Sequence, residues 1–144
     1  MEKRRVAVRT LVETVMLSGS LSATASSARL LDGIRGHQAL QSIAAEGAQN
    51  EVPVSGAVSS EHIDLAVYGR IDRLYGDTRV EEIKTTYLDS DRLAPGDPQH
   101  WAQAKCYSFL FCETAGVAQI DVSLTYFHLG TGEVTTFTEP YPRE

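Results

Sequence analysis

Two short stretches decide the fold: Gly69-Arg70-Ile71-Asp72, and Glu82-Ile83-Lys84, which begins ten residues after the aspartate. We interpret them as parts of two strands of a hairpin. Side chains in a strand alternate between faces, so Glu82 and Lys84 project on one side while Ile83 points into the core. Two carboxylates and an ammonium on one face destabilise a sheet unless they have a function, such as binding a ligand. A divalent cation between Asp72 and Glu82, with Lys84 close by, is the arrangement that metal-dependent phosphodiester hydrolysis needs.

Three consecutive segments rich in Val, Ile, Thr and Tyr predict neighbouring strands: Glu51 to Val58, His62 to Tyr75 and Thr78 to Tyr87. Gly76-Asp77 marks the turn between the last two. Asp72 and Glu82 face one metal only if their strands pair in a register that puts both on the same side of the sheet. This requirement favours an odd-numbered connection such as Gly76-Asp77-Thr78 over a two-residue loop.

Helical periodicity precedes these strands. Apolar residues at helical spacing predict a short amphipathic helix from Val8 to Leu17 and a second helix from about Ser26 to Glu46. Gly33 and Gly36 weaken the second helix, so we expect it to pack closely against a neighbour. We interpret Lys3-Arg4-Arg5 as a solvated terminus; the alternative is that these residues add nonspecific affinity for a nucleic-acid backbone.

The dipeptide Asp97-Pro98 is a good cap and first-turn pair, and it predicts a helix from Pro98 to Ala115 that ends at Gly116. Two more strands follow, about Ala118 to Leu129 and Glu133 to Glu139. The predicted order is therefore helix, helix, three strands, helix, two strands. This order indicates an α/β fold with a mixed central β-sheet flanked by helices.

Length and composition limit the class of protein. The 144 residues fit a single domain, residues 1–144, and the end of the chain just after a strand is compatible with a domain taken from a longer protein. No apolar run approaches the ~20 residues of a membrane span. Arg9 and Glu13 interrupt the only N-terminal apolar stretch, so it lacks the apolar core of a signal peptide. We expect no membrane association and a cytoplasmic location.

The net charge of −6 argues against a domain that coats nucleic acid by bulk electrostatics. A metal site needs its carboxylates, however, and a bound cation with local arginines attracts phosphate despite an acidic total. The two cysteines, Cys106 and Cys112, fall on different faces of one predicted helix, far from disulfide geometry. Structural zinc sites and iron-sulfur clusters usually take four such ligands, so we expect neither from this chain.

Four motifs occur in a fixed order: Gly33-Ile34-Arg35-Gly36-His37, Gly69-Arg70-Ile71-Asp72, Glu82-Ile83-Lys84 and Gln103-Ala104-Lys105-Cys106-Tyr107. In this order and on these elements the set resembles the RecB-like branch of the PD-(D/E)XK nuclease superfamily, where a helix carries G-x-x-x-H, one strand an aspartate, the next E-x-K, and a later helix Q-x-x-x-Y. The segment from His100 to Tyr107 also looks like that of nuclease domains fused to DinG-like helicases. The resemblance implies a restriction-endonuclease-like core.

The resemblance further implies a metal site. It makes His37, Asp72 and Glu82 ligands of Mg²⁺ or Mn²⁺, with the Ile83 carbonyl completing the protein side. Hard oxygen ligands suit Mg²⁺, and one imidazole shifts the preference toward Mn²⁺. Taken alone, His37 has a simpler interpretation as a packed helix histidine, and the two carboxylates with Lys84 as a surface hairpin with a cross-strand ion pair.

The remaining site residues surround this metal. Lys84 is expected to position or help deprotonate the attacking water. Gln103 and Tyr107 share one helical face with His100 close to it, and the resemblance implies that they contact DNA or orient the lysine. Tyr107 among aromatic neighbours also fits a core residue. Arg70 is expected on the Asp72 face, where it contacts phosphate or pairs with Asp72 or Glu81.

The sequence thus predicts a Mg²⁺- or Mn²⁺-dependent deoxyribonuclease in which Asp72, Glu82 and Lys84 are catalytic. By analogy with the family it is an exonuclease of DNA repair or recombination, with DNA as substrate and a helicase domain, in the same or a separate chain, as partner. The alternative is a catalytically silent DNA-binding module of a helicase or repair complex.

Overall fold

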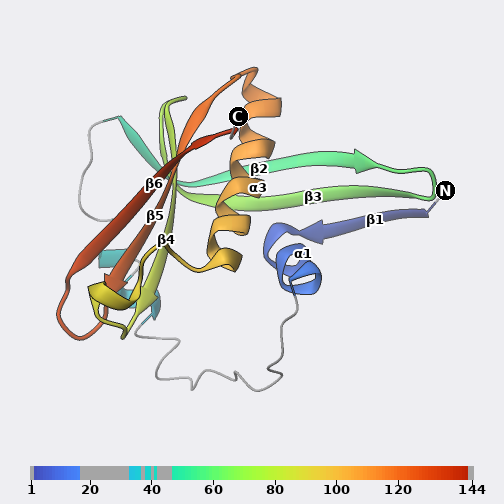
Figure 1. Ribbon diagram of the computed structural model, residues 1–144. Helices are drawn as coiled ribbons and strands as arrows, with labels where there is room; N and C mark the ends of the chain where they lie inside the picture. Colours follow the sequence, from blue (N-terminus) through green and yellow to red (C-terminus); the bar gives the residue numbers. More distant parts are fainter. Residues whose placement is uncertain (1, 17–32, 37, 40, 42–46, 143–144) are drawn as a thin grey trace.

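The computed structural model describes residues 2–16, 33–36, 38–39, 41 and 47–142 (Figure 1). Within these residues six strands and two longer helices form an α/β fold, and residues 33–36, 38–39 and 41 are also helical. The elements are β1 (Glu2–Ala7), α1 (Val8–Val15), β2 (Ala48–Ser59), β3 (Ile63–Tyr75), β4 (Arg79–Thr86), the 3₁₀-helix η1 (Ser90–Arg92), α3 (Pro98–Ala115), β5 (Ile120–His128) and β6 (Val134–Tyr141).

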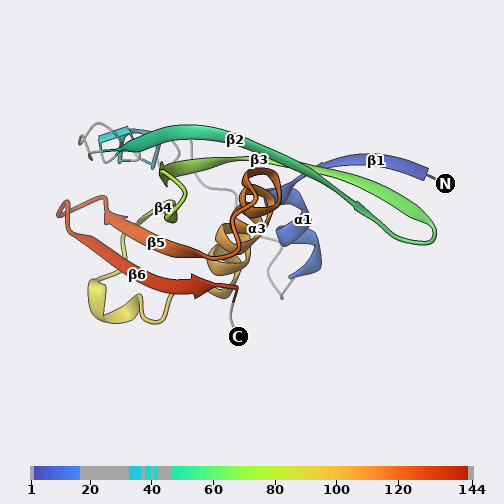
Figure 2. The same cartoon turned by 90° about the horizontal axis from the view of Figure 1, so that it is seen from above.

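The sheet is mixed. Its order is β1-β3-β4-β5-β6, and β2 pairs with β3 along the other edge of that strand. The pairs β1–β3 and β4–β5 are parallel, whereas β2–β3, β3–β4 and β5–β6 are antiparallel. Seen from above, α3 lies between β3 and the β5–β6 pair, with α1 beside it, so the curved sheet wraps around these helices (Figure 2). The predicted fold class, a mixed sheet flanked by helices, is confirmed.

Helix α3 joins two clusters of core residues. Its buried Tyr107 and Leu110 pack with side chains from α1, β3, β4 and β5, including Ile71 and Val80. Nearer the start of α3, Trp101 and Ala104 pack in a second cluster with three apolar side chains of β5 and with the buried Leu93. Because α3 belongs to both clusters, it holds the β4–β6 half of the sheet against the β1–β3 half.

Local signals predicted α3 and the hairpin correctly. The Asp97 side chain accepts a hydrogen bond from Gln99 N at 2.8 Å, and the helix ends at Gly116, whose φ of 69° suits glycine. Tyr75 pairs with Arg79, so the β3–β4 connection contains three residues, as the shared face of Asp72 and Glu82 requires. The same register places these two residues opposite each other where the ladder ends.

The interpretation of Lys3-Arg4-Arg5 as a solvated terminus is correct for the side chains but misses a strand. These residues belong to β1, which pairs with β3 in parallel from Glu2↔Ile63 to Ala7↔Tyr68. The reason is that the following helix α1 buries Val8 and Val12 against β3, which brings the preceding residues alongside that strand. The side chains of residues 3–5 remain exposed.

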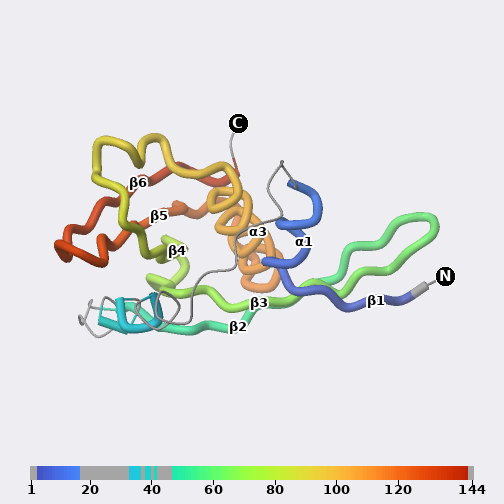
Figure 3. Tube along the Cα trace, turned by 90° about the horizontal axis from the view of Figure 1, so that it is seen from below, coloured from blue at the N-terminus to red at the C-terminus, as the bar shows by residue number. Residues whose placement is uncertain are grey.

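The helical residues 33–36, 38–39 and 41 lie near the ends of β4 and β5, away from α1 (Figure 3). A Cβ at Gly36 would come within 2.8 Å of Leu129 Cδ2, so the expected close packing at this glycine is confirmed. Cys106 and Cys112 are free thiols. None of the helices in the described part of the chain is long and apolar enough to cross a membrane.

Candidate active site

The site lies at the point on β3 where pairing with β1 ends and pairing with β4 has not yet begun. Along one edge, β3 pairs with β1 as far as Tyr68 and with β4 from Arg73 onward. Between these two ladders runs the stretch Gly69-Arg70-Ile71-Asp72, which pairs with no strand of the described residues on this edge. The motif that decided the fold prediction therefore occupies an interruption of the sheet, and side chains can enter there from both β3 and β4.

Asp72 bridges this interruption. Its Oδ2 accepts a hydrogen bond from the backbone amide of Ile83 at 2.8 Å, at the position where β4 has left the ladder with β3. In a strand, the N–H and C=O of one residue leave toward the same edge. The Ile83 carbonyl therefore faces the same side as Asp72, which is the placement expected for a metal ligand.

Glu82 is a buried acid beside a second acid. Only 4% of the residue is exposed. Burial raises the pKa of the Glu82 carboxyl to about 8, the neighbouring Asp72 carboxylate adds to the rise, and Lys84 opposes it. Lys84 Nζ lies 3.2 Å from Glu82 Oε1, whereas the buried Oε2 receives no hydrogen bond from any described residue. A buried oxygen without a donor is costly, so a hydrogen-bond donor or a cation beside Oε2 would stabilise the site.

Lys84 begins a chain of polar contacts that ends on α3. Its Nζ donates to Gln103 Oε1 at 2.7 Å, and Gln103 Nε2 donates to the Tyr107 hydroxyl at 3.2 Å. Gln103 and Tyr107 are one helical turn apart, so both project from the same face of α3, Gln103 toward Lys84 of β4 and Tyr107 toward Gly69 of β3. Among the described residues, Glu82 and Gln103 use two of the three N–H donors of Lys84, which leaves one for a bound molecule.

Tyr107 is both a core residue and a site residue. Its ring packs directly on Gly69, where a Cβ would collide with the ring. Burial raises the pKa of the Tyr107 hydroxyl to about 12, with Glu82 as the next cause. The hydroxyl therefore stays protonated at neutral pH and remains available as a hydrogen-bond donor.

The hydrogen-bond partners of His100 indicate which tautomer its ring adopts. The Tyr126 hydroxyl accepts from Asp97 N at 3.0 Å and lies 2.9 Å from His100 Nδ1. The hydroxyl proton itself needs an acceptor, and among the described residues His100 Nδ1 lies within hydrogen-bond distance of it, so we assign Nδ1 as the acceptor. The other ring nitrogen, Nε2, then carries the hydrogen. Burial, and next Lys84, lower the pKa of His100 below its ordinary value, so the ring is a neutral donor.

Two further residues, outside the predicted set of site residues, reach the site. Gln41 Nε2 donates to the Asp72 carbonyl at 3.0 Å and to Glu51 Oε1 at 2.9 Å. Glu51, the one non-glycine residue with a positive φ in the described part of the chain, lies opposite Asp72 in the β2–β3 register. No local pattern marks Gln41, because its contact to Asp72 spans 31 residues.

These groups line one cleft of about 760 Å³. Gly33, Ile34, Gln38 and Gln41 contribute one wall, α3 another, and β3 and β4 the acids and the lysine. The lining consists of Arg9, Gly33, Ile34, Gln38, Gln41, Glu51, Asp72, Glu82, Ile83, Lys84, Thr85, His100, Gln103 and Tyr107. The cleft thus brings together seven of the nine predicted site residues: Asp72, Glu82, Ile83, Lys84, His100, Gln103 and Tyr107.

Arg70 does not join them. It lines a separate hollow with Arg5 and Tyr68, and it makes no ion pair with Asp72 or Glu81 among the described residues. The expectation that Arg70 shares the Asp72 face is wrong because the alternation of β3 changes next to Asp72: Ile71 and Leu74, three residues apart, pack in the same core cluster. Glu81 instead lies 3.6 Å from Arg73 Nη1 and accepts from Thr125 Oγ1 at 2.6 Å.

The donor set fits a hard divalent cation in part. No group of three or more His, Cys, Asp or Glu side chains is placed to hold a metal within the described residues, and the predicted ligand His37 lies outside them. Asp72 and Glu82 supply two carboxylates, and the Ile83 carbonyl faces the same edge. The unpaired Oε2 and the raised pKa of Glu82 are what two adjacent carboxylates show when no cation separates them.

Comparison with known proteins supports the fold. No protein-family model and no curated protein matches the chain. Among solved structures, the chain is similar to one described as the crystal structure of SSO0001, with a TM-score of 0.66 and 22% sequence identity, over 100% of this chain and 70% of that chain. Similarity at this level of identity concerns the fold.

Proposed function

We propose that this chain is a Mg²⁺- or Mn²⁺-dependent deoxyribonuclease domain of the RecB-like PD-(D/E)XK type. The observation that carries the proposal is the pair Asp72 and Glu82 beside Lys84 at the interruption of the sheet, with Glu82 Oε2 buried and without a donor. A packed structural core gains nothing from a buried acid next to a second acid, whereas a cation site requires adjacent carboxylates.

Asp72, Glu82 and the Ile83 carbonyl would hold the cation, with His37 as a further ligand implied by the resemblance. When bound, the cation would supply Lewis-acid activation of water and would neutralise charge on the scissile phosphate. Lys84, fixed by Glu82 and Gln103, directs its remaining N–H at the water or at a phosphate oxygen. His100 adds a neutral donor through Nε2. The water oxygen would bond to phosphorus as the P–O bond to the leaving nucleoside oxygen breaks. A proton of the water passes to solvent, and the leaving oxygen takes up a proton from solvent to become a hydroxyl.

The test is cleavage of end-labelled single-stranded, double-stranded and flap DNA with Mg²⁺, Mn²⁺ or EDTA. We expect metal-dependent products from the unchanged protein and none from Asp72→Asn or Lys84→Met. Glu61→Gln, which removes an exposed acid at the β2–β3 turn, serves as the matched control and is expected to cleave normally.

The product ladder also separates the finer predictions. Release of single nucleotides from an end would support the exonuclease mode, and internal fragments would contradict it. If the unchanged protein binds DNA and Mn²⁺ but does not cleave, the silent DNA-binding module becomes the better proposal. A helicase partner, a role in repair or recombination and a cytoplasmic location remain expectations from the resemblance and the composition.

A further inference from the structure

A second hollow, of about 600 Å³, lies on the other face of the β1–β2–β3 part of the sheet. Its lining includes Arg5 from β1, Ser55 from β2, and Tyr68 and Arg70 from β3. The register explains this grouping, since Ser55 pairs with Tyr68 and Arg5 pairs with Ala66, two residues before Tyr68. Directly paired residues, and residues two apart on one strand, share a face.

The hollow is cationic in an acidic protein. Arg5 and Arg70 both line it, both are exposed, and no carboxylate contributes to the lining. The chain as a whole carries a net charge of −6. Two arginines at one recess are therefore a local excess of positive charge, and the ligand that such an excess favours is an anion.

Arg5 also forms a stacked platform. Its guanidinium carbon lies 3.9 Å from the centroid of the Tyr68 ring, so the planar cation covers the aromatic face. Guanidinium planes and aromatic rings are the surfaces on which unpaired bases stack, while neighbouring arginines bind the phosphates. Ser55 adds a hydroxyl that can donate to a phosphate or a base edge.

The hollow and the active-site cleft are connected through one strand. Arg70 lines the hollow and Asp72 lines the cleft, two residues farther along β3, a separation of about 7 Å along a strand. Gly69, which also lines the hollow, contacts Tyr107 of the cleft from its other side. Along β3, Arg70 therefore lies between Tyr68, on which Arg5 stacks, and Asp72 of the cleft.

We infer that this hollow binds the single-stranded part of a DNA substrate next to the scissile phosphodiester, an inference that rests on the proposed nuclease function. A recess fits an unpaired base, which can enter it, better than a duplex, whose bases stay stacked inside the helix. Arg5 and Tyr68 take a base, and Arg70 takes the phosphate nearest the cleft.

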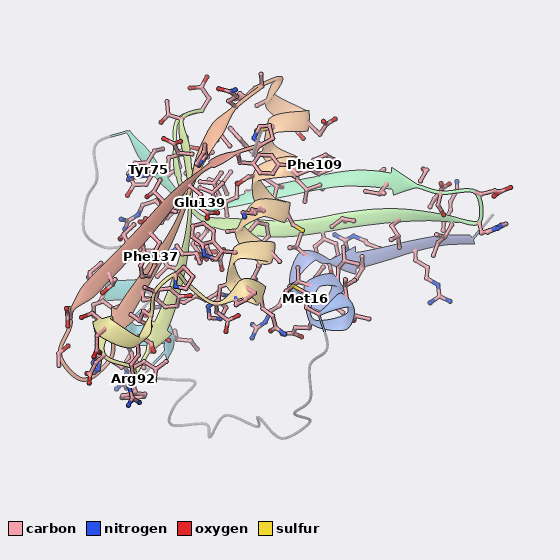
Figure 4. The ribbon with its side chains drawn as sticks, in the orientation of Figure 1. Met16, Tyr75, Arg92, Phe109, Phe137 and Glu139 are labelled. Carbon is pink, nitrogen blue, oxygen red and sulfur yellow. The ribbon has the colours of Figure 1, made fainter. Side chains whose placement is uncertain are left out.

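The test measures binding of a labelled oligothymidylate to the whole protein in EDTA, where metal-dependent cleavage stops, across a series of salt concentrations. We compare the unchanged protein with Arg5→Ala/Arg70→Ala and with Arg92→Ala. Arg92 is the matched control because this exposed arginine of η1 lies at the opposite end of the molecule from β1 (Figure 4). Circular dichroism establishes that each variant is folded.

We expect the double variant to bind about fivefold more weakly at moderate salt and to lose about 0.7 from the slope of log affinity against log salt for each phosphate contact removed. Arg92→Ala is expected to match the unchanged protein. Equal affinity and slope in the double variant would overturn the inference, as would an equal loss of affinity for blunt duplex DNA, which would contradict the single-strand assignment.

Cleavage with Mn²⁺ separates this inference from the proposed function. If the unchanged protein cleaves DNA while the double variant binds normally, the hollow is not the binding surface and the nuclease proposal stands. If the unchanged protein does not cleave but the double variant loses single-strand binding, the binding surface is supported and the nuclease proposal fails.

Discussion

The carboxylate of Asp72 accepts a hydrogen bond from the backbone amide of Ile83 at 2.8 Å, across the point where β3 and β4 stop pairing. A side chain here takes the place of a ladder hydrogen bond. Asp72 therefore has a structural role, as the acceptor for the Ile83 amide of β4, in addition to its proposed role as a cation ligand. Mutation can separate the two roles.

Asp72→Asn keeps an acceptor oxygen for Ile83 N and removes the charge, whereas Asp72→Ala removes both. In urea unfolding with EDTA present, we expect Asp72→Asn to have nearly the same free energy of unfolding as the unchanged protein. Asp72→Ala should lose about 1–3 kcal/mol, because the Ile83 amide is left without this acceptor. Both variants should lose Mn²⁺-dependent cleavage. Equal unfolding free energies for the two variants would contradict the structural role of the Asp72–Ile83 hydrogen bond.

Glu82→Gln should stabilise the protein when metal is absent. The pKa of Glu82 is raised from 4.5 to about 8 on folding, first by burial and then by Asp72. The folded state therefore holds an extra proton between these pH values, and the free energy of unfolding of the unchanged protein in EDTA falls as pH rises through that window. Glutamine has no proton to lose, so this pH dependence should flatten.

Thermal unfolding in EDTA at pH 8 checks this expectation. We expect Glu82→Gln to raise the Tm by roughly 3–6 °C, the shift that about 1–2 kcal/mol produces in a domain of this size. Mn²⁺ should raise the Tm of the unchanged protein but not that of the variant. A lower Tm for Glu82→Gln in EDTA would show that Glu82 is a stabilising partner of Lys84 instead of a strained ligand.

Gln103→Met removes the amide that joins Lys84 to Tyr107 while keeping a side chain of similar length. The lysine then loses its 2.7 Å acceptor and its fixed position. We expect the cleavage rate at saturating DNA to fall about tenfold with little change in DNA affinity in EDTA, because orientation is lost and not charge.

Gln99→Met is the control for this experiment. Gln99 lies on the same helix, but its Nε2 donates to the Met16 carbonyl at 3.1 Å, outside the cleft. Its cleavage rate should therefore match that of the unchanged protein. A tenfold loss in both variants would point to a general effect on α3, and no loss in Gln103→Met would remove Gln103 from the site.

Tyr126→Phe should allow His100 to adopt both neutral tautomers. In the unchanged protein we expect ¹⁵N NMR to show hydrogen on Nε2 and a pKa below 6.5, lowered by burial and by Lys84. In the variant Nδ1 loses its 2.9 Å partner, so both neutral tautomers should be populated. An unchanged spectrum, or hydrogen on Nδ1 in the unchanged protein, would contradict the assignment.

What the sequence could predict followed from local chemistry. Asp97, Pro98 and Gly116 mark the ends of α3 through capping and backbone preferences that act within a few residues. Strand alternation with the Gly76-Asp77-Thr78 connection was sufficient to place Asp72 opposite Glu82. The spacing of Gln103 and Tyr107 predicted their common helical face.

The missed features depend on contacts distant in sequence. β1 pairs with residues about sixty positions later, and no pattern in Lys3-Arg4-Arg5 announces a strand. Arg70 was misplaced because the change of alternation beside Asp72 accompanies the positive φ of Glu51 on the neighbouring strand. Gln41 entered the site from a helix whose position relative to β3 only the folded chain defines.

The short ladder between β3 and β4 has one more consequence. Only three residue pairs, Arg73↔Glu81 to Tyr75↔Arg79, join these strands, whereas β2 and β3 share eleven pairs. The backbone connection between the two halves of the sheet is therefore a narrow seam, and the proposed cation would sit directly beside it. A metal ion in this position would hold β3 and β4 together in addition to its role in catalysis. Amide hydrogens of β3 and β4 beside this short ladder should therefore exchange more slowly when Mn²⁺ or Mg²⁺ is present.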